Sequence, residues 1–306
     1  MKHEIAVGVM TAPKIEAVIP GPHSTPERPT FLLKNVRIGI GFHWDRLEDQ
    51  EFEGTLEIRD NADGTQTAIN RLDVEDYLSS VITSEMSATS SLELLKAHAV
   101  ISRSWVLRPI ISPSTGTDKP DLSDPDRHVV WYERDAHEGF DVCADDHCQR
   151  YEGITRRDEH PEAAANVQKA IDATRGQVLM YDGKVCDARF YKSCGGATEL
   201  FENAWANEHY PYLEAVRDEI GTPLPDLTIE ENAQAFIRTS PSAYCNTTDE
   251  RILSQVLNNY DQETKDFYRW TVQYTAAELS EIIRERSGID FGEILDLVPI
   301  KRGPSA

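Results

Sequence analysis

A helical periodicity between Leu92 and Leu107 constrains the fold of this chain more than any other feature of its sequence. Residues three and four positions apart share one face of a helix, so the segment divides into two stripes. These stripes are Leu92, Leu95, Ala99 and Ser102 on one side, and Lys96, Val100 and Arg103 on the other. The pattern predicts a central helix that is largely buried against a sheet.

One carboxylate, Glu85, lies just before this helix, and the Ser/Thr run Ser87–Ser91 between them offers several N-caps. The apolar residues in front of Glu85 predict the end of a strand or a turn. Lys96 and Arg103 are almost two helical turns apart and point nearly the same way. A carboxylate at the mouth of a helix with two stacked cations indicates a site for a polar substrate. In the alternative, Glu85 only serves the helix N-terminus and both cations are solvated.

The chain before this helix is β-rich. The expected strands are Glu4–Met10, Phe31–Phe42, Gly54–Arg59 and Thr65–Leu72, with a loop at Pro20–Pro29 and a hairpin turn at residues 61–64. Further along, we expect a helix over Pro161–Arg175 and a hairpin turning at Asp182-Gly183, with strands Gln177–Tyr181 and Lys184–Tyr191. The sequence therefore predicts an α+β fold with a mixed sheet.

The remaining segments carry weaker patterns. Ser112–Asp126 is rich in Ser, Pro and Asp and predicts an exposed loop. Helices are expected at Thr228–Ile237, Asp249–Leu257 and Leu279–Arg286, the last opened by a capping box at Thr275, and strands at Phe267–Tyr274 and Ile294–Ile300.

The charge of the chain excludes some classes of partner. A net charge of −22 over 306 residues argues against nucleic acid and anionic membrane surfaces. No apolar run is long enough to span a bilayer, and the N-terminus lacks the layout of a signal peptide. The residues alone leave the compartment open.

Two cysteines and two histidines lie close together in the sequence, at His137, Cys143, His147 and Cys148. Thiolates with imidazoles favour Zn²⁺ in a tetrahedral structural site that closes a loop. His147 is the least suited of the four, because adjacent ligands strain a tight loop. The alternative is two buried thiols or a disulfide beside surface histidines. Cys186, Cys194 and Cys245 remain, and they allow at most one disulfide and one free thiol.

The predicted second hairpin leads into Lys192-Ser-Cys-Gly-Gly-Ala-Thr-Glu199. Two glycines after a strand let the backbone approach a ligand closely. Ser193 is a weak candidate for a nucleophile, since no histidine is evidently paired with it.

Two of these motifs resemble those of the SpoIID/LytB family. The Ser-Glu-Met triplet at Glu85, the following Leu-Lys-Ala run and Arg103 are very similar to the core motif of that family. The segment Ser193–Glu199, with Trp205 after it, resembles the second signature, Ser-x-Gly-Gly-x-Thr-Glu. The resemblance implies a SpoIID-like domain over residues 51–306, preceded by a β-rich extension over residues 1–50. Members of the family continue into a Gly-His-Gly signature that this chain does not show, so we expect an incomplete domain.

The resemblance also implies a function, lytic transglycosylation of peptidoglycan strands that lack stem peptides. One carboxylate suffices for this reaction, whereas ordinary glycosidases need two. Glu85 would protonate the leaving oxygen and then deprotonate the primary hydroxyl of the muramic acid, which leaves an anhydro-muramyl end. The expected substrate contacts are Lys96, Arg103, Ser193, Gly195, Gly196, Thr198 and Glu199, with the glycine segment forming the groove wall opposite Glu85.

The resemblance extends to the metal, the compartment and the partners. Some members bind zinc between the two motifs, which implies His137, Cys143, His147 and Cys148 as ligands of a structural Zn²⁺. A cell-envelope location and a cell-wall amidase as a partner are expected as well. Two alternatives stay open. One is a non-catalytic glycan-binding or amidase-enhancing module, and the other is a zinc hydrolase with an open coordination position.

Overall fold

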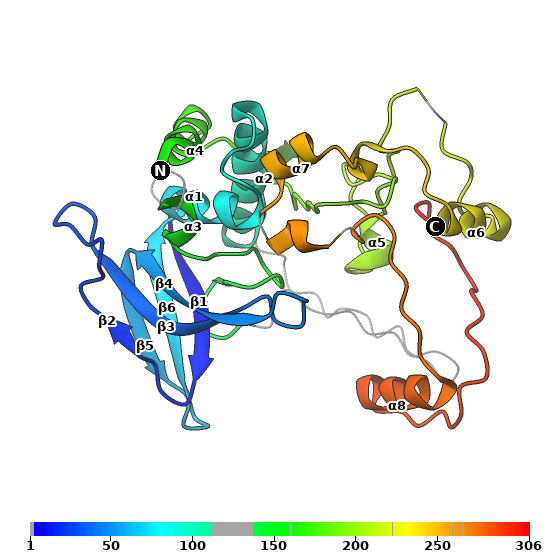
Figure 1. Cartoon of the computed structure of the whole chain (residues 1–306), viewed down its shortest axis with the longest axis horizontal. Coiled ribbons are helices and arrows are strands. Elements are labelled where there is room, and N and C mark those ends of the chain that lie inside the picture. Colours follow the sequence, from blue (N-terminus) through cyan, green and yellow to red (C-terminus); the bar gives the residue numbers. More distant parts are fainter. Residues whose placement is uncertain (1–2, 112–136, 159–160, 222, 259, 265) are drawn as a thin grey trace. The chain divides into compact units, whose positions relative to one another are not determined.

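Figure 1 presents a computed structural model of the chain, which describes residues 3–111, 137–158, 161–221, 223–258, 260–264 and 266–306. The chain divides into two units. Unit 1 comprises Met1–Phe190 and Asp249–Glu263, and unit 2 comprises Tyr191–Thr248 and Thr264–Ala306. The loop predicted at Ser112–Asp126 lies outside the described residues.

Unit 1 contains a four-stranded mixed sheet, as predicted, in the order β5-β6-β1-β7. Its strands are β1 (Glu4–Ala12), β5 (Thr55–Asp60), β6 (Gln66–Asp73) and β7 (Val142–Cys143). β1 is antiparallel to β6 and parallel to β7. The predicted hairpin is confirmed, with β5 antiparallel to β6 and Gly64 at φ 83° in the turn.

A second, three-stranded sheet has the order β2-β3-β4. Its strands are β2 (Ala17–Val18), β3 (Thr30–Ile38) and β4 (Arg46–Glu53). Phe31, Leu33 and Phe52 of this sheet are buried in one core cluster with Ile5 and Val7 of β1. The boundary predicted between residues 50 and 51 falls inside β4, and β1 of the N-terminal region pairs with β6, so unit 1 includes the first fifty residues.

The strand or turn expected before Glu85 is wrong, because these residues form helix α1 (Val74–Glu85). Asp73 caps its N-terminus by accepting a hydrogen bond from the backbone N–H of Glu75. The second half of α1 is rich in apolar residues, among them β-branched ones, which also suit a strand, so the local pattern is ambiguous. Tertiary packing selects the helical conformation of this segment, since α1 lies against β1 and β6.

The predicted central helix is α2 (Leu92–Ile111), and it is largely buried. Ser91 caps it by accepting a hydrogen bond from the backbone N–H of Leu94 at 3.3 Å. The expectation that it packs on a sheet needs correction, because its main neighbours are α1, α4 (Pro161–Ala173) and the short strand β9 (Lys184–Val185). Figure 1 shows the three helices gathered beside the blue and cyan strands of unit 1.

Short elements complete unit 1. They are α3 (Thr155–Asp158), β8 (Met180–Tyr181), α7 (Glu250–Val256) and the 3₁₀ helix η2 (Tyr260–Glu263). The turn predicted at Asp182-Gly183 is confirmed, with φ values of 46° and 73°, although β8 and β9 are shorter than the predicted strands. The predicted helices at Pro161–Arg175 and Asp249–Leu257 correspond to α4 and α7.

Unit 2 has little regular structure among its described residues. Its helices are α5 (Phe201–Ala204), α6 (Glu230–Arg238), the 3₁₀ helix η1 (Tyr244–Asn246) and α8 (Ala276–Ser287). The capping box between Thr275 and Glu278 is confirmed. The strands predicted at Phe267–Tyr274 and Ile294–Ile300 are wrong, because neither segment joins a ladder in the described chain. Alternation alone does not form a strand without a partner strand.

Across the described residues, we find no helix that combines the length and the apolar character needed to cross a membrane.

Candidate active site and metal cluster

Glu85 is the last residue of α1 and is half-buried. Its Oε1 accepts a hydrogen bond from the backbone N–H of Arg150 at 2.8 Å. The C-terminus of a helix carries partial negative charge, so a carboxylate at this position does not stabilise α1 through the helix dipole. Glu85 is therefore held by the loop that contains Arg150, and not at the N-terminus of α2 as one alternative expected.

The residue before it, Ser84, fixes the last turn of α1. Its carbonyl oxygen accepts hydrogen bonds from Asn258 Nδ2 at 2.6 Å and from the Tyr260 hydroxyl at 3.3 Å. Its hydroxyl accepts the backbone N–H of Glu152 at 3.1 Å. Terminal carbonyls of a helix lack partners within the helix, and here a distant segment supplies them. The backbone that carries Glu85 is thus clamped from two sides.

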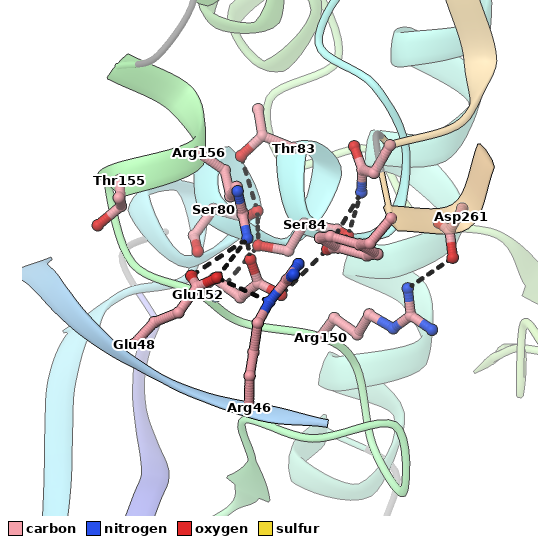
Figure 2. A network of polar contacts seen from close by, with 12 residues as sticks. Arg46, Glu48, Ser80, Thr83, Ser84, Arg150, Glu152, Thr155, Arg156 and Asp261 are labelled. Carbon is pink, nitrogen blue, oxygen red and sulfur yellow. Dashed lines mark hydrogen bonds and ion pairs between the residues drawn. The ribbon is translucent and has the colours of Figure 1, made fainter. Parts of the chain in front are cut away.

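A buried polar network lies next to this clamp, and Figure 2 shows it between β4 and the loop that follows Arg150. Glu152 accepts hydrogen bonds from Arg156 at 2.7 Å and from the Tyr260 hydroxyl at 3.1 Å. Burial raises the pKa of Glu152, while Arg156 opposes that shift. Because its partners are protein groups and it is only 2% exposed, Glu152 acts as a structural carboxylate.

Arg150 connects Glu85 to several other groups. Its guanidinium forms ion pairs with Asp146 at 2.6 Å and with Asp261 at 3.4 Å, the second of which is drawn in Figure 2. Burial works against the charge of Arg150, but Asp146, Asp261 and Glu85 outweigh it and raise the pKa of the guanidinium. Arg150 is therefore a permanent cation beside Glu85.

The guanidinium of Arg150 also lies over a stack of aromatic rings. Its Cζ is 4.5 Å from the ring centroid of Trp44. Trp44 stacks on Tyr260 with centroids 4.4 Å apart and on Phe42 with centroids 5.9 Å apart. Trp44 is buried, whereas Phe42 is 48% exposed. The turn between β3 and β4 thus carries the exposed ring of Phe42. This ring contacts Trp44, which in turn lies against Arg150 beside Glu85.

The four residues predicted as metal ligands come together. The donor atoms of His137, Cys143, His147 and Cys148 all lie within 4.8 Å of one another. Strand β7 positions Cys143 by pairing with β1, and the Asp141 carboxylate just before it accepts the backbone N–H of Ala6 at 2.8 Å. The sheet edge therefore holds the start of this loop.

The distances within this cluster fit one tetrahedral ion. His137 Nε2 lies 3.1 Å from Cys148 Sγ, and His147 Nδ1 lies 3.5 Å from Cys148 Sγ and 3.9 Å from Cys143 Sγ. Zinc–sulfur and zinc–nitrogen bonds of about 2.3 and 2.0 Å place tetrahedral ligands about 3.5 Å apart. The four residues could therefore hold a metal ion.

The electrostatics of the cluster favour a thiolate. A hydrogen bond with Cys148 is the largest influence on Cys143 and lowers its pKa to about 5, and His137 and His147 act in the same direction. A thiolate is the form of cysteine that binds a metal. The loop then continues from Cys148 to Arg150, whose N–H binds Glu85.

The two cations predicted on α2 have different surroundings. The Lys96 ammonium lies 2.7 Å from Glu93 on the outer face of α2. Arg103 is fully buried, and its Nε and Nη2 donate to the two carboxylate oxygens of Glu75 at 3.0 and 2.6 Å, while its Nη1 donates to the carbonyl oxygen of Gln177 at 3.1 Å. The expectation that Arg103 contacts substrate needs correction, because this side chain joins α2 to α1 in the core.

The glycine segment belongs to unit 2, where local hydrogen bonds brace it. Gly195 and Gly196 have φ values of 67° and 106°, which glycine adopts readily, and a Cβ on Gly196 would meet the Tyr268 hydroxyl at 2.6 Å. The Ser193 hydroxyl accepts the N–H of Gly195 at 3.4 Å. Thr198 donates to the carbonyl oxygen of Glu214, and Glu199 accepts from Ser305 and Asn203.

Several residues of the site carry no motif that would have revealed them. Asn258, Tyr260 and Asp261 come from a segment more than a hundred residues after Glu85 that has only ordinary helical character. Phe42 and Trp44 offered a weak signal, since two aromatic residues stand between a glycine and an aspartate at a predicted strand end.

Comparison with known proteins agrees with the motifs. Residues 62–181, which include Glu85 and the four clustered Cys and His residues, match the family model of the stage II sporulation protein (SpoIID). Residues 199–306 match a domain of unknown function (DUF8618).

Curated relatives match between about half and three fifths of the chain. The amidase enhancer of Bacillus subtilis (strain 168) is 30% identical over 188 residues, which is 59% of this chain and 22% of that protein. Stage II sporulation protein D of the same strain is 26% identical over 151 residues, 49% of this chain and 40% of that protein. An uncharacterized protein of Brachyspira hyodysenteriae is 29% identical over 152 residues, 50% of this chain and 34% of that protein.

Residues 62–181 are thus similar to the SpoIID family, in agreement with the predicted resemblance to the SpoIID/LytB family. The matched region spans two fifths or less of the length of each of these relatives.

Proposed function

We propose that the chain acts on the bacterial cell wall as a lytic transglycosylase, with Glu85 as the acid and base. The supporting observation is the position of Glu85, a half-buried carboxylate at the unfavourable end of α1, held there by hydrogen bonds to its side chain and to the neighbouring Ser84. This carboxylate does not stabilise its own helix through the helix dipole, yet hydrogen bonds fix its position. That combination is expected of a side chain with a catalytic role.

The proposed substrate is a peptidoglycan strand that lacks stem peptides. Glu85 protonates the leaving glycosidic oxygen, and the same carboxylate then accepts the proton of the primary hydroxyl of the muramic acid. That hydroxyl attacks the anomeric carbon, so an anhydro-muramyl end forms and no water is consumed. Other carboxylates near Glu85, such as Asp146 and Asp261, are paired with Arg150, which favours a mechanism with one carboxylate.

Contacts to the glycan are proposed from both the structure of unit 1 and the family resemblance. The exposed ring of Phe42 offers an apolar face on which a sugar can stack, and its stack on Trp44 keeps that ring in place. Lys96 and the residues Ser193, Gly195, Gly196, Thr198 and Glu199 remain proposed contacts from the family resemblance. Arg103 is left out because it is buried against Glu75.

We also propose that His137, Cys143, His147 and Cys148 hold a structural Zn²⁺. Four protein ligands close the coordination shell, which supports a structural role and speaks against a zinc hydrolase. The ion would fix the loop whose continuation binds Glu85. Its contribution is thus to the position of the carboxylate.

The second candidate function is that of an amidase-enhancing module that binds glycan without cleaving it. The supporting observation is the match to a relative named amidase enhancer. Such a module would retain the glycan contacts and the metal cluster, and a cell-wall amidase in the cell envelope would be its partner. It would not need the titrating proton of Glu85.

The test is cleavage of denuded peptidoglycan, followed by mass spectrometry of anhydro-muramyl ends. Positioned acid catalysis contributes about 10²–10⁴-fold, so Glu85→Gln should lower cleavage at least that far while glycan binding survives. Glu162→Gln is the matched control, because the same change is made at an exposed carboxylate on α4, and it should cleave normally. Phe42→Ala should weaken glycan binding more than it slows turnover.

Each result separates the two functions. If the parent protein cleaves the glycan and Glu85→Gln cleaves it equally well, the catalytic role assigned to Glu85 is wrong. Glycan binding without cleavage by the parent, together with stimulation of an amidase, would support the enhancer.

A further inference from the structure

Two cysteines that the sequence left unassigned lie in contact in unit 2. Cys194 Sγ and Cys245 Sγ are 3.7 Å apart, although 51 positions separate them in the sequence. A disulfide has its sulfur atoms about 2.05 Å apart, so a closure of about 1.7 Å would join them. Both side chains are half-buried, which leaves them within reach of a small reagent.

The backbone around both cysteines is held by one residue, Asp218. Its backbone N–H donates to the carbonyl oxygen of Gly196 at 3.1 Å, on the side of Cys194. Its Oδ2 accepts the N–H of Cys245 at 2.8 Å, and its carbonyl oxygen accepts the N–H of Tyr244 at 2.8 Å. The contact between the sulfur atoms is therefore built into the packing of two loops.

A metal ion fits this place less well than it fits the cluster of unit 1. The donor atoms of Cys194, Asp218 and Cys245 lie within 4.8 Å of one another, and the described residues provide no fourth member of this group. Structural zinc takes four protein ligands. One oxygen of Asp218 already accepts the N–H of Cys245. Because the two thiols contact each other and the set of metal ligands is incomplete, a disulfide is favoured over a metal site.

We propose that Cys194 and Cys245 form a redox pair whose oxidised state is a disulfide that ties the Gly195–Gly196 turn to η1. A low-molecular-weight disulfide serves as the oxidant. One cysteine thiolate attacks it and releases one thiolate of the reagent, and the second cysteine attacks the mixed disulfide and releases the other. The cysteine pair loses two electrons and two protons, and the reagent becomes two thiols.

Unit 2 has a physical need for such a cross-link. Its core cluster consists of the buried residues Ala197, Leu227 and Phe236, with partly buried Leu224 and Ala306 packed against it. A unit with so small a core gains much from a covalent link, as small domains in oxidising compartments do. Ala197 follows the tied turn directly, so the link holds the turn against this core.

The experiment uses the full chain, treated with oxidised glutathione and then alkylated under denaturing conditions without reductant. Peptide mapping should find the Cys194 and Cys245 peptides joined, two hydrogens lighter than the separate thiols. Cys186, which is buried in unit 1, should be alkylated and serves as the internal control. Reductant should lower the melting temperature of the oxidised protein by at least about 5 °C, and a Cys194→Ser/Cys245→Ser double variant should not respond to it.

Three outcomes would overturn the proposal. The first is full alkylation of both Cys194 and Cys245 after treatment with oxidised glutathione. The second is a disulfide that joins either of them to Cys186. The third is one equivalent of zinc per chain that Cys245→Ser removes, which would make the group a metal site.

Discussion

Each unit of this protein brings two cysteines together, but the surroundings give them different chemistry. In unit 1, Cys143 and Cys148 share their site with two imidazoles, and the hydrogen bond with Cys148 lowers the pKa of Cys143 to about 5. In unit 2, Cys194 and Cys245 lie beside the Asp218 carboxylate, and burial raises the pKa of Cys194 to about 12. Cys143 is thus set up as a metal-binding thiolate, whereas Cys194 is held as a protonated thiol in contact with Cys245.

The two units also differ in the size of their hydrophobic cores. Unit 1 buries a large apolar cluster between its sheets and helices, whereas the cluster of unit 2 has three buried members. A large core can hold a loop in place by packing, while a small one depends more on local bonds and cross-links. The residues around a cysteine pair, and the size of the core that holds it, therefore decide whether the pair suits a metal or a disulfide.

The largest expected effect is that of metal removal from unit 1. Structural zinc contributes about 10–16 kcal/mol of apparent binding free energy, so a chelator should lower the melting temperature strongly. Metal analysis should find about one equivalent per chain, as one four-ligand site requires, and Cys148→Ser should abolish it. Cys245→Ser is the matched control in unit 2 and should leave the metal content unchanged. Full metal content in Cys148→Ser would show that these four residues do not form the metal site.

The next effect concerns the reactivity of Cys194 in the reduced protein. With a pKa of about 12, its thiolate fraction at pH 7 is about one in 10⁵, so alkylation should be slow until the pH rises or the chain unfolds. Its ordinary pKa is 9.0, so the unfolded state releases the proton first, and the reduced protein should lose stability as the pH rises from about 9 to about 12.

Alkylation rates read by mass spectrometry, together with urea titrations across this pH range, check this expectation. The oxidised protein is the control, because a disulfide has no thiol to titrate. Labelling of folded Cys194 at pH 7 at the rate of an unfolded cysteine would contradict it.

A third prediction compares two Arg–Glu pairs of similar geometry. Removing one partner of a buried pair leaves an uncompensated charge, so Glu75→Gln should cost about 3–5 kcal/mol of unfolding free energy in unit 1, because it strands the guanidinium of the fully buried Arg103. Glu230→Gln breaks the pair with Arg302 on the surface of unit 2, and its effect should be too small to resolve. Urea unfolding measures both. Equal losses would mean that burial does not distinguish the pairs.

Loss of a helix cap should cost less than the loss of the buried Glu75–Arg103 pair. Asp73 caps α1 in unit 1, and Thr275 caps α8 in unit 2. Changing either to Ala should cost about 1 kcal/mol, because one backbone N–H loses its partner. Hydrogen exchange should show the loss in the first turn of the affected helix alone. A much larger loss for Asp73→Ala would mean that its carboxylate supports the sheet as well.

Local chemistry made part of this protein predictable from its residues. The capping box at Thr275 and the Asp182-Gly183 turn depend on neighbours in the sequence, and both are found as predicted. The four Cys and His residues lie within one short segment of the sequence, so their spacing was enough to bring them together. The motif around Glu85 indicated the family, which the comparisons support.

Only the tertiary structure decided which long-range partner each side chain meets. Arg103 has the spacing of a solvent-facing cation, but Glu75 lies opposite it across the α1–α2 contact and makes it a core residue. Three cysteines allowed three pairings, and the fold put Cys194 beside Cys245. The clamp on Glu85 comes from Asn258 and Tyr260, far along the chain. Sequence spacing determines which residues share a turn or a helix face, whereas contacts between distant segments depend on how the elements pack.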